Sequence, residues 1–162
     1  MKRKIKRIMY SVLMLTFVLA LAGCGEKNKE IKEYTINADQ DFLLWDLGCS
    51  PDDIEKQAGT KPEVTEKSSF TLYSYDGVMV NGHEANVTLK VEGGKLVVGV
   101  ASFEVEDGIG LYEELFSELT NLYGAPYVMA VKSNANWSVD GIIISLTVSE
   151  SKTKVLYGVQ YP

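Results

Sequence analysis

Two cysteines, one histidine and several paired carboxylates are the residues of this chain that could carry covalent or acid–base chemistry. A zinc site built from several cysteines and histidines is excluded, because the chain has too few of both. Cys49 and His83 could act as a nucleophile and its base. Cys49 can equally be a small buried apolar residue, which is the simpler interpretation. The spacing of the two residues leaves both interpretations open.

Carboxylates stand close together at three places in the sequence, which are Asp39 with Asp41, Asp52 with Asp53, and Glu104 with Glu106 and Asp107. Glycoside hydrolysis needs two carboxylates across a cleft, and neighbours in sequence do not establish that arrangement. Asp39 and Asp41 could bind calcium, but the twelve-residue loop spacing is absent. A solvated surface is the simpler interpretation of all three groups.

Glycine and serine motifs that support phosphate binding or acyl transfer are also incomplete. Gly108, Ile109 and Gly110 precede a predicted helix, but the third glycine and the lysine of phosphate-binding loops are missing. The strand-to-helix Gly-x-Ser-x-Gly elbow of serine hydrolases is absent. The sequence therefore predicts a protein that is not an enzyme and has no cofactor and no metal.

The other cysteine, Cys24, ends a segment typical of protein export. Five basic residues within positions 2–7 precede an apolar run over residues 8–21, which is shorter than the roughly 20 residues of a membrane-spanning helix. The run closes with Leu21, Ala22, Gly23 and Cys24. This ending resembles the lipobox of bacterial lipoproteins at all four positions. An ordinary cleaved signal peptide with a chance cysteine is the alternative.

The lipobox resemblance implies that residues 1–23 are a signal peptide and that Cys24 carries lipid. The lipid would hold the chain to the outer, extracytoplasmic side of the cell membrane. Gly25 follows the cysteine where an inner-membrane retention signal has Asp. The sequence therefore leaves the choice of membrane open in a cell that has two.

Loss of the signal peptide changes the charge of the protein. Removal of residues 1–23 leaves 139 residues, with 11 basic and 22 acidic side chains and a formal charge of −11. This balance argues against nucleic acid as a partner, because nucleic-acid-binding proteins need basic surfaces. Because lipid would occupy Cys24, Cys49 has no partner for an intramolecular disulfide.

Residues 24–41 are predicted to be the lipidated cysteine and a flexible tether, and residues 42–162 a single α+β domain. A first helix is predicted to begin at Ser50 and Pro51 and to end at Gly59. Cys49 and Ile54 are placed for a hydrophobic staple around its start. A second helix is predicted from its apolar stripe of Leu111, Leu115, Leu119 and Leu122, and Gly124 is predicted to end it.

Alternating apolar residues predict antiparallel strands after each helix, so the pattern of helix and strands occurs twice. Residues 73–78 match residues 137–142, and residues 95–100 match residues 154–159, including Gly99 with Gly158. The expected fold class is therefore α+β, with two tandem repeats at about 42–105 and 106–162 forming one sheet packed by helices. Chance similarity between β-hairpins is the alternative.

The two halves resemble the repeat of the β-lactamase-inhibitor-protein-like fold, which the small lipoprotein of the outer-membrane barrel-assembly machine also has. The resemblance covers about residues 42–161 and rests on Trp45, on the helix start at Ser50, Pro51 and Asp52, and on Gly and Pro after each helix. It departs from the pattern in the short first helix and in Gly-x-x-Pro after it. The resemblance implies a fold and says little about function.

Five aromatic residues on the predicted strands are the candidate binding surface, namely Tyr73, Tyr75, Trp137, Tyr157 and Tyr161. On an open sheet face they would recognise a protein or peptide partner. The alternative is that they face the helices and form the core. The expected function is a membrane-anchored, non-enzymatic binding module. An inhibitor of a secreted hydrolase and an envelope-assembly accessory are the alternatives.

Overall fold

A computed structural model of the chain describes residues 33–130 and 133–162. The predicted signal peptide, Cys24 and most of the predicted tether therefore lie outside the described residues. The fold already includes residues upstream of position 42, where the sequence placed the start of the domain. Tyr34 and Ile36 are buried and belong to the core. Residues 31–162 form one compact unit that holds this whole core.

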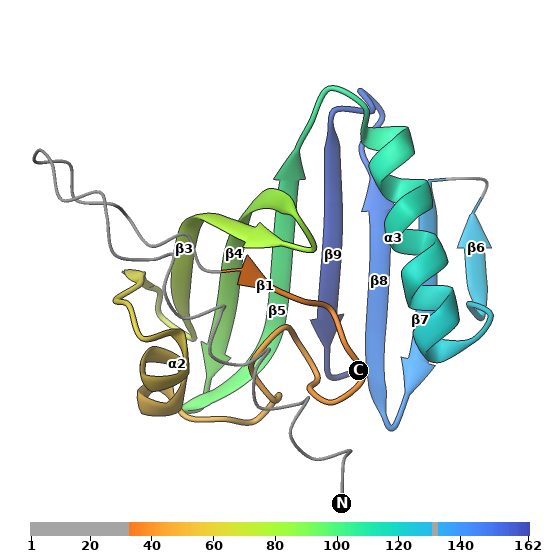
Figure 1. Cartoon of the computed structure of the whole chain (residues 1–162). Helices are drawn as coiled ribbons and strands as arrows, with labels where there is room; N and C mark the ends of the chain where they lie inside the picture. Colours follow the sequence, from red (N-terminus) through yellow and green to blue (C-terminus); the bar gives the residue numbers. More distant parts are fainter. Residues whose placement is uncertain (1–32, 131–132) are drawn as a thin grey trace, which may run out of the picture. The chain divides into compact units, whose positions relative to one another are not determined.

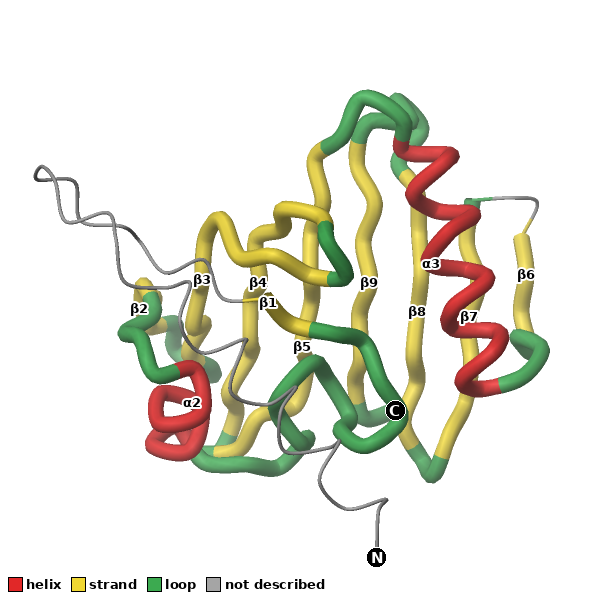
Figure 2. The backbone as a smooth tube through the Cα atoms, viewed as in Figure 1, coloured by secondary structure: helices red, strands yellow, loops and turns green. Residues whose placement is uncertain are grey.

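The described chain has a mixed α+β fold in which nine strands form one sheet (Figures 1 and 2). The strands are β1 (Glu33–Tyr34), β2 (Glu63–Glu66), β3 (Thr71–Val80), β4 (His83–Glu92), β5 (Lys95–Glu104), β6 (Val128–Ala130), β7 (Asn134–Val139), β8 (Ile142–Val148) and β9 (Lys154–Gln160). Their order across the sheet is β1-β3-β4-β5-β9-β8-β7-β6, and β2 also pairs with β3. All pairs are antiparallel except β1 with β3.

Helix α2 (Pro51–Ala58) confirms the first predicted helix and its local signals. The Ser50 hydroxyl accepts a hydrogen bond from the Asp53 backbone N–H, and the Asp53 carboxylate accepts one from the Ser50 backbone N–H. These bonds satisfy backbone donors that a helix start leaves free. Gly59 ends the helix in the left-handed conformation, which glycine adopts without steric cost.

Helix α3 (Gly108–Tyr123) confirms the second predicted helix. It lies across β7, β8 and β9 in Figure 1. Leu111, Leu115 and Leu119 are buried against the sheet, whereas Leu122 is 40% exposed. The prediction of Leu122 as part of the apolar stripe was therefore wrong, because in the last turn of α3 it is Tyr123, four residues after Leu119, that packs against the core.

The first half of the sheet is covered by α2 and by the loop over residues 35–50. Phe42 and Trp45 of this loop are fully buried. The Phe42 ring stacks on Tyr157 with a centroid distance of 5.6 Å, and its atoms lie 2.3 Å from where a Cβ on Gly99 would stand. Glycine at position 99 therefore lets the loop reach the sheet. We call the side with α2, α3 and this loop the covered face, and the other side the open face.

Gly99 and Gly158 match in sequence but lie on opposite faces of the sheet. Gly99 pairs with Leu89 and Val159, which are buried on the covered face, whereas Gly158 pairs with Val100 and Ser145 on the open face. The reason is a bulge, because Lys90 pairs with Val98 while Val91 pairs with Leu96. The extra residue in β5 reverses which side chains face the core beyond it.

Candidate binding surface

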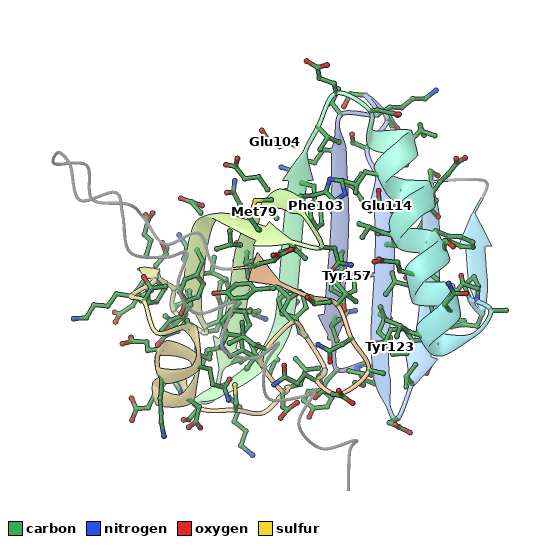
Figure 3. The ribbon with its side chains drawn as sticks, viewed as in Figure 1. Met79, Phe103, Glu104, Glu114, Tyr123 and Tyr157 are labelled. Carbon is green, nitrogen blue, oxygen red and sulfur yellow. The ribbon has the colours of Figure 1, made fainter. Side chains whose placement is uncertain are left out.

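Three of the five predicted surface aromatics belong to the core. Tyr75, Trp137 and Tyr157 expose 4% or less of their surface and point to the covered face. Figure 3 shows Tyr157 on the side of the sheet that carries α3. Trp137 Nε1 donates a hydrogen bond of 2.8 Å to the Gly124 carbonyl. The prediction of an open-face position for these three residues was therefore wrong, and the alternative of a core position was right.

The other two aromatic residues, Tyr73 and Tyr161, do not form a cluster on the open face either. Tyr73 shares the covered face with Tyr75, because they are two residues apart on β3. Burial, and then the charges of Glu55 and Asp52, raise the pKa of Tyr73. Tyr161 follows β9 and is 49% exposed, and its hydroxyl donates to the Leu47 carbonyl at 3.2 Å. The structure therefore does not bring the five residues together on one exposed surface.

The open face presents hydroxyl, amide and aliphatic side chains. Strand pairing aligns them in rows, one of which runs through Ser74, Thr88, Val100, Gly158, Ser145 and Asn136. The rows on either side are Leu72, Lys90, Val98, Gln160, Ile143 and Ser138, and Asn86, Ser102, Leu156, Thr147 and Asn134. Both helices lie on the other side of the sheet (Figure 1).

Aliphatic side chains gather near the centre of the open face. Val98 and Val100 come from β5, Leu156 from β9 and Ile143 from β8, and these three strands are neighbours. Leu156 is 38% exposed, and the other three are half-buried. Ser, Thr and Asn side chains flank them on β4, β7 and β8. An apolar centre with a neutral polar surround is typical of protein-binding surfaces.

Charged residues at the ends of the open face pair with each other. Lys90 Nζ lies 2.8 Å from a Glu92 carboxylate oxygen and 4.9 Å from the centroid of the Phe70 ring. Lys154 Nζ lies 3.4 Å from a Glu104 carboxylate oxygen at the opposite end of the strands. These pairs are largely exposed, so each contributes little to stability. Glu84 of β4 is exposed on the same side as Asn86, so the open face as a whole carries a small negative charge.

The net charge of the domain lies almost wholly on the covered side. Residues 33–58 and 107–123, which hold β1, the covering loop and both helices, carry eleven acidic residues and one lysine. Residues 59–106 and 124–162, which hold the other eight strands, carry nine acidic residues and seven lysines. The formal charge is therefore −10 on the first set of segments and −2 on the second.

A shallow depression of about 490 Å³ lies where β5 ends and β9 begins, and its lining includes Glu104, Glu106, Ser149, Ser151 and Lys154. Its polar groups bond to each other. The hydroxyls of Ser149 and Ser151 lie 2.9 Å apart, and Lys154 pairs with Glu104. The depression therefore has no set of free ligands aimed at a common centre.

The pairing of Cys49 with His83 considered from the sequence finds no support in the geometry. His83 Nε2 lies 3.1 Å from a carboxylate oxygen of Glu114 on α3. Partial burial, followed by the nearby charges of Asp53 and Asp46, raises the pKa of the Cys49 thiol. A raised pKa keeps the thiol protonated at neutral pH, whereas a nucleophile needs the thiolate.

Residues 33–130 and 133–162 are the described part of the chain, and two absences hold within them. In these ranges no group of three or more acidic, cysteine or histidine side chains could hold a metal ion. In the same ranges no helix has the length and apolar character that crossing a membrane requires.

Comparison with known proteins gives no family for this chain. No protein-family model, no curated protein and no solved structure matches it. The open face is therefore the candidate site because of its position in the fold and its side chains, without support from a relative.

Proposed function

We propose that the chain is an exported lipoprotein whose domain binds a protein or peptide partner through the open face of its sheet. In this proposal residues 1–23 are removed, Cys24 carries the lipid, and the domain works outside the cytoplasmic membrane as a non-enzymatic binding module. The lipobox sequence supports the anchor. The composition of the open face supports the binding role.

The observation that carries the binding role is the difference in chemistry between the open face and the rest of the surface. Leu156 and its aliphatic neighbours occupy the middle of a face that no helix of the described chain covers. The surrounding Ser, Thr and Asn side chains offer both hydrogen-bond donors and acceptors. This combination suits a polypeptide partner, which presents apolar side chains and peptide groups together.

We also propose that the domain arose from two tandem repeats, residues 42–105 and 106–162. The order of elements supports this, because α2 precedes β2, β3, β4 and β5, and α3 precedes β6, β7, β8 and β9. The sheet order supports it too, because β5 and β9 are neighbours and the other strands follow outward in reverse order. Leu89 and Leu146 stand at the same place in the similar segments 88–91 (TLKV) and 145–148 (SLTV), and both are fully buried. The resemblance to the β-lactamase-inhibitor-protein-like repeat is part of this proposal.

Affinity capture with matched variants tests the binding role. The domain and its variants Leu156→Lys and Leu122→Lys are immobilised and exposed to envelope and culture-medium proteins. Both leucines expose about the same fraction, 38% and 40%, but Leu156 lies on the open face and Leu122 on α3. We expect a partner that the wild type and Leu122→Lys retain and that Leu156→Lys loses. Equal retention by all three proteins would contradict an open-face site.

The identity of a captured partner distinguishes the alternative functions. A secreted hydrolase that the domain slows would favour an inhibitor, and a component of the envelope assembly machinery would favour an accessory role. The anchor has its own test, which is mass spectrometry of the mature chain from the membrane fraction. We expect a chain that begins at a lipid-modified Cys24. A soluble mature chain without lipid would contradict the anchor.

A further inference from the structure

We propose that the partner of the open face is a second copy of this chain, so that two sheets pack face to face. This inference rests on the proposed binding function and names its partner. Two observations carry it, namely the distribution of charge and the small and aliphatic side chains of the central row, and the area of the face sets the expected strength of the pair.

Charge restricts how two copies of an acidic domain can approach each other. The covered-side segments carry a formal charge of −10, and the remaining segments carry −2 with seven of the eight lysines. Contact between two covered sides would bring eleven acidic residues of each copy together. Contact between two open faces brings together three rows in which Lys90 is the one charged residue, and Lys90 is already paired with Glu92. Like-charged copies can therefore meet at the open face with the least repulsion.

Dissolved salt screens most of the remaining repulsion between the acidic covered sides of two copies packed face to face. Packed sheets lie about 10 Å apart. The helix layers would lie behind the two sheets, so the acidic covered sides would be separated by well over the screening length of about 8 Å at physiological salt. The acidic charge then stays on the two outer surfaces of the pair, where water surrounds it.

The side chains of the open face suit packing between two sheets. Its central row contains small and aliphatic residues, including Thr88, Val100, Gly158 and Ser145, and no aromatic ring interrupts it. Two faces with low, regular side chains can approach closely, as the inner faces of a β-sandwich do. Leu156 rises beside the central row and is the most exposed of the central aliphatic residues.

The area of the open face limits how tightly two copies of the chain can bind each other. Six strands about 4.8 Å apart and three rows of side chains give the face about 600 Å². A standard stable interface buries about 800 Å² on each partner. The open face falls below this value, so we expect a reversible dimer whose population depends on concentration. Confinement of the chains to a membrane through Cys24 would raise their local concentration.

Sedimentation velocity of residues 31–162 tests the proposal, because this unit contains the whole described core. Protein concentration is varied from about 1 µM to about 1 mM, which covers weak association. We expect the wild type and Leu122→Lys to form dimers with the same dissociation constant. Leu156→Lys should raise that constant at least about tenfold, because two copies of the lysine would lose water in the interface. Thr147→Lys, beside Leu156 on β8, should act in the same direction.

The full-length chain in its membrane provides a second measurement. Cys49→Ala leaves one free thiol when combined with Leu156→Cys or with the control Leu122→Cys. A short bifunctional thiol reagent should link two chains through position 156 and not through position 122. Equal linking at both positions would overturn the proposal.

Failure of this inference is distinguishable from failure of the proposed function. A wild type that stays monomeric up to about 1 mM, while capture of another protein depends on Leu156, would overturn self-pairing and leave the binding role intact. A dimer that Leu156→Lys and Thr147→Lys both leave unchanged would also overturn self-pairing. A dimer that both substitutions weaken supports it, whether or not another protein is captured.

Discussion

The two faces of the sheet differ in chemistry although the same strands form both. The covered face holds aromatic rings and the acidic elements that pack on it, and its side chains are almost fully buried. The open face holds Ser, Thr, Asn and aliphatic side chains of low height and almost no net charge. Stability therefore depends on the first face, and the proposed contact with a partner would use the second.

This difference separates two roles that are often mixed on one surface. The aromatic residues that give the largest contact area in many interfaces are here used for folding. The open face is left with residues whose replacement costs little stability. Matched substitutions on the two faces can therefore test the comparison, and the largest effects are expected on the covered face.

Trp137→Ala and its neighbour Asn136→Ala give the largest contrast. Trp137 is 1% exposed on the covered face, and its indole N–H donates to the Gly124 carbonyl. Its loss leaves a cavity and removes that bond, so we expect a decrease of about 3–5 kcal/mol in the free energy of unfolding. Asn136 points to the open face, and its replacement should cost less than about 0.5 kcal/mol. Urea denaturation measures the free energy of unfolding of both variants. Similar losses for the two would contradict the difference between the faces.

Gly99→Ala and Gly158→Ala give the second contrast. A Cβ at position 99 would stand 2.3 Å from the Phe42 ring, which is fully buried. We expect a cost of about 2–3 kcal/mol, because the ring can move only by disturbing the core. A Cβ at position 158 would meet the Ser145 hydroxyl at 3.3 Å, and a small rotation relieves that contact. Gly158→Ala should change the free energy of unfolding by less than about 1 kcal/mol.

Alkaline pH should lower the stability of the fold through Tyr157, a buried residue of the covered face. Burial raises the pKa of Tyr157 above its ordinary value of 10.0, so the unfolded chain loses the Tyr157 proton at a lower pH than the folded chain does. Stability is unaffected below pH 10 and falls as pH rises above it, by about 1.4 kcal/mol per pH unit for this group. Circular dichroism at increasing pH should show a shallower loss of stability for Tyr157→Phe. Parallel curves for both proteins above pH 10 would count against the assigned cause.

Leu156→Lys and Leu122→Lys should have the smallest effects on stability. Both leucines are partly exposed, and a lysine can place its ammonium group in water while its chain keeps some contact. We expect changes within about 0.5 kcal/mol for each. Urea denaturation of the two variants checks this. A large loss for Leu156→Lys would mean that the open face also contributes to the core, and it would weaken the separation of roles.

Local signals in the sequence predicted the helices well. Ser50, Pro51 and Gly59 act through contacts within a few residues of themselves, so their effect is visible without the rest of the fold. The strands after each helix were also predicted from alternation. Alternation is informative without the rest of the fold, because a period of two is a property of each strand alone.

Which face of the sheet the helices cover could not be predicted. Ser145 and Thr147 alternate with Ile144, Leu146 and Val148, which groups the apolar residues of β8 on one face but does not tell whether helices or a partner cover that face. That choice is made by pairing with β9 and by packing of α3, which are contacts over long sequence distances. The bulge in β5 has no local signal, and it moved Gly99 to the face opposite Gly158. Long-range contacts of this kind place Tyr75, Trp137 and Tyr157 in the core and not on an exposed surface.

Photo-crosslinking in living cells tests the central claim, the division between a covered core face and an open contact face, most directly. A photoreactive amino acid is placed at position 156 in one full-length chain and at position 122 in another, and adducts are compared after irradiation. The two positions expose almost the same fraction of leucine side chain. We expect a discrete adduct from position 156, to a second copy or to another protein, and none from position 122. Discrete adducts only from position 122, or from neither position, would contradict the account.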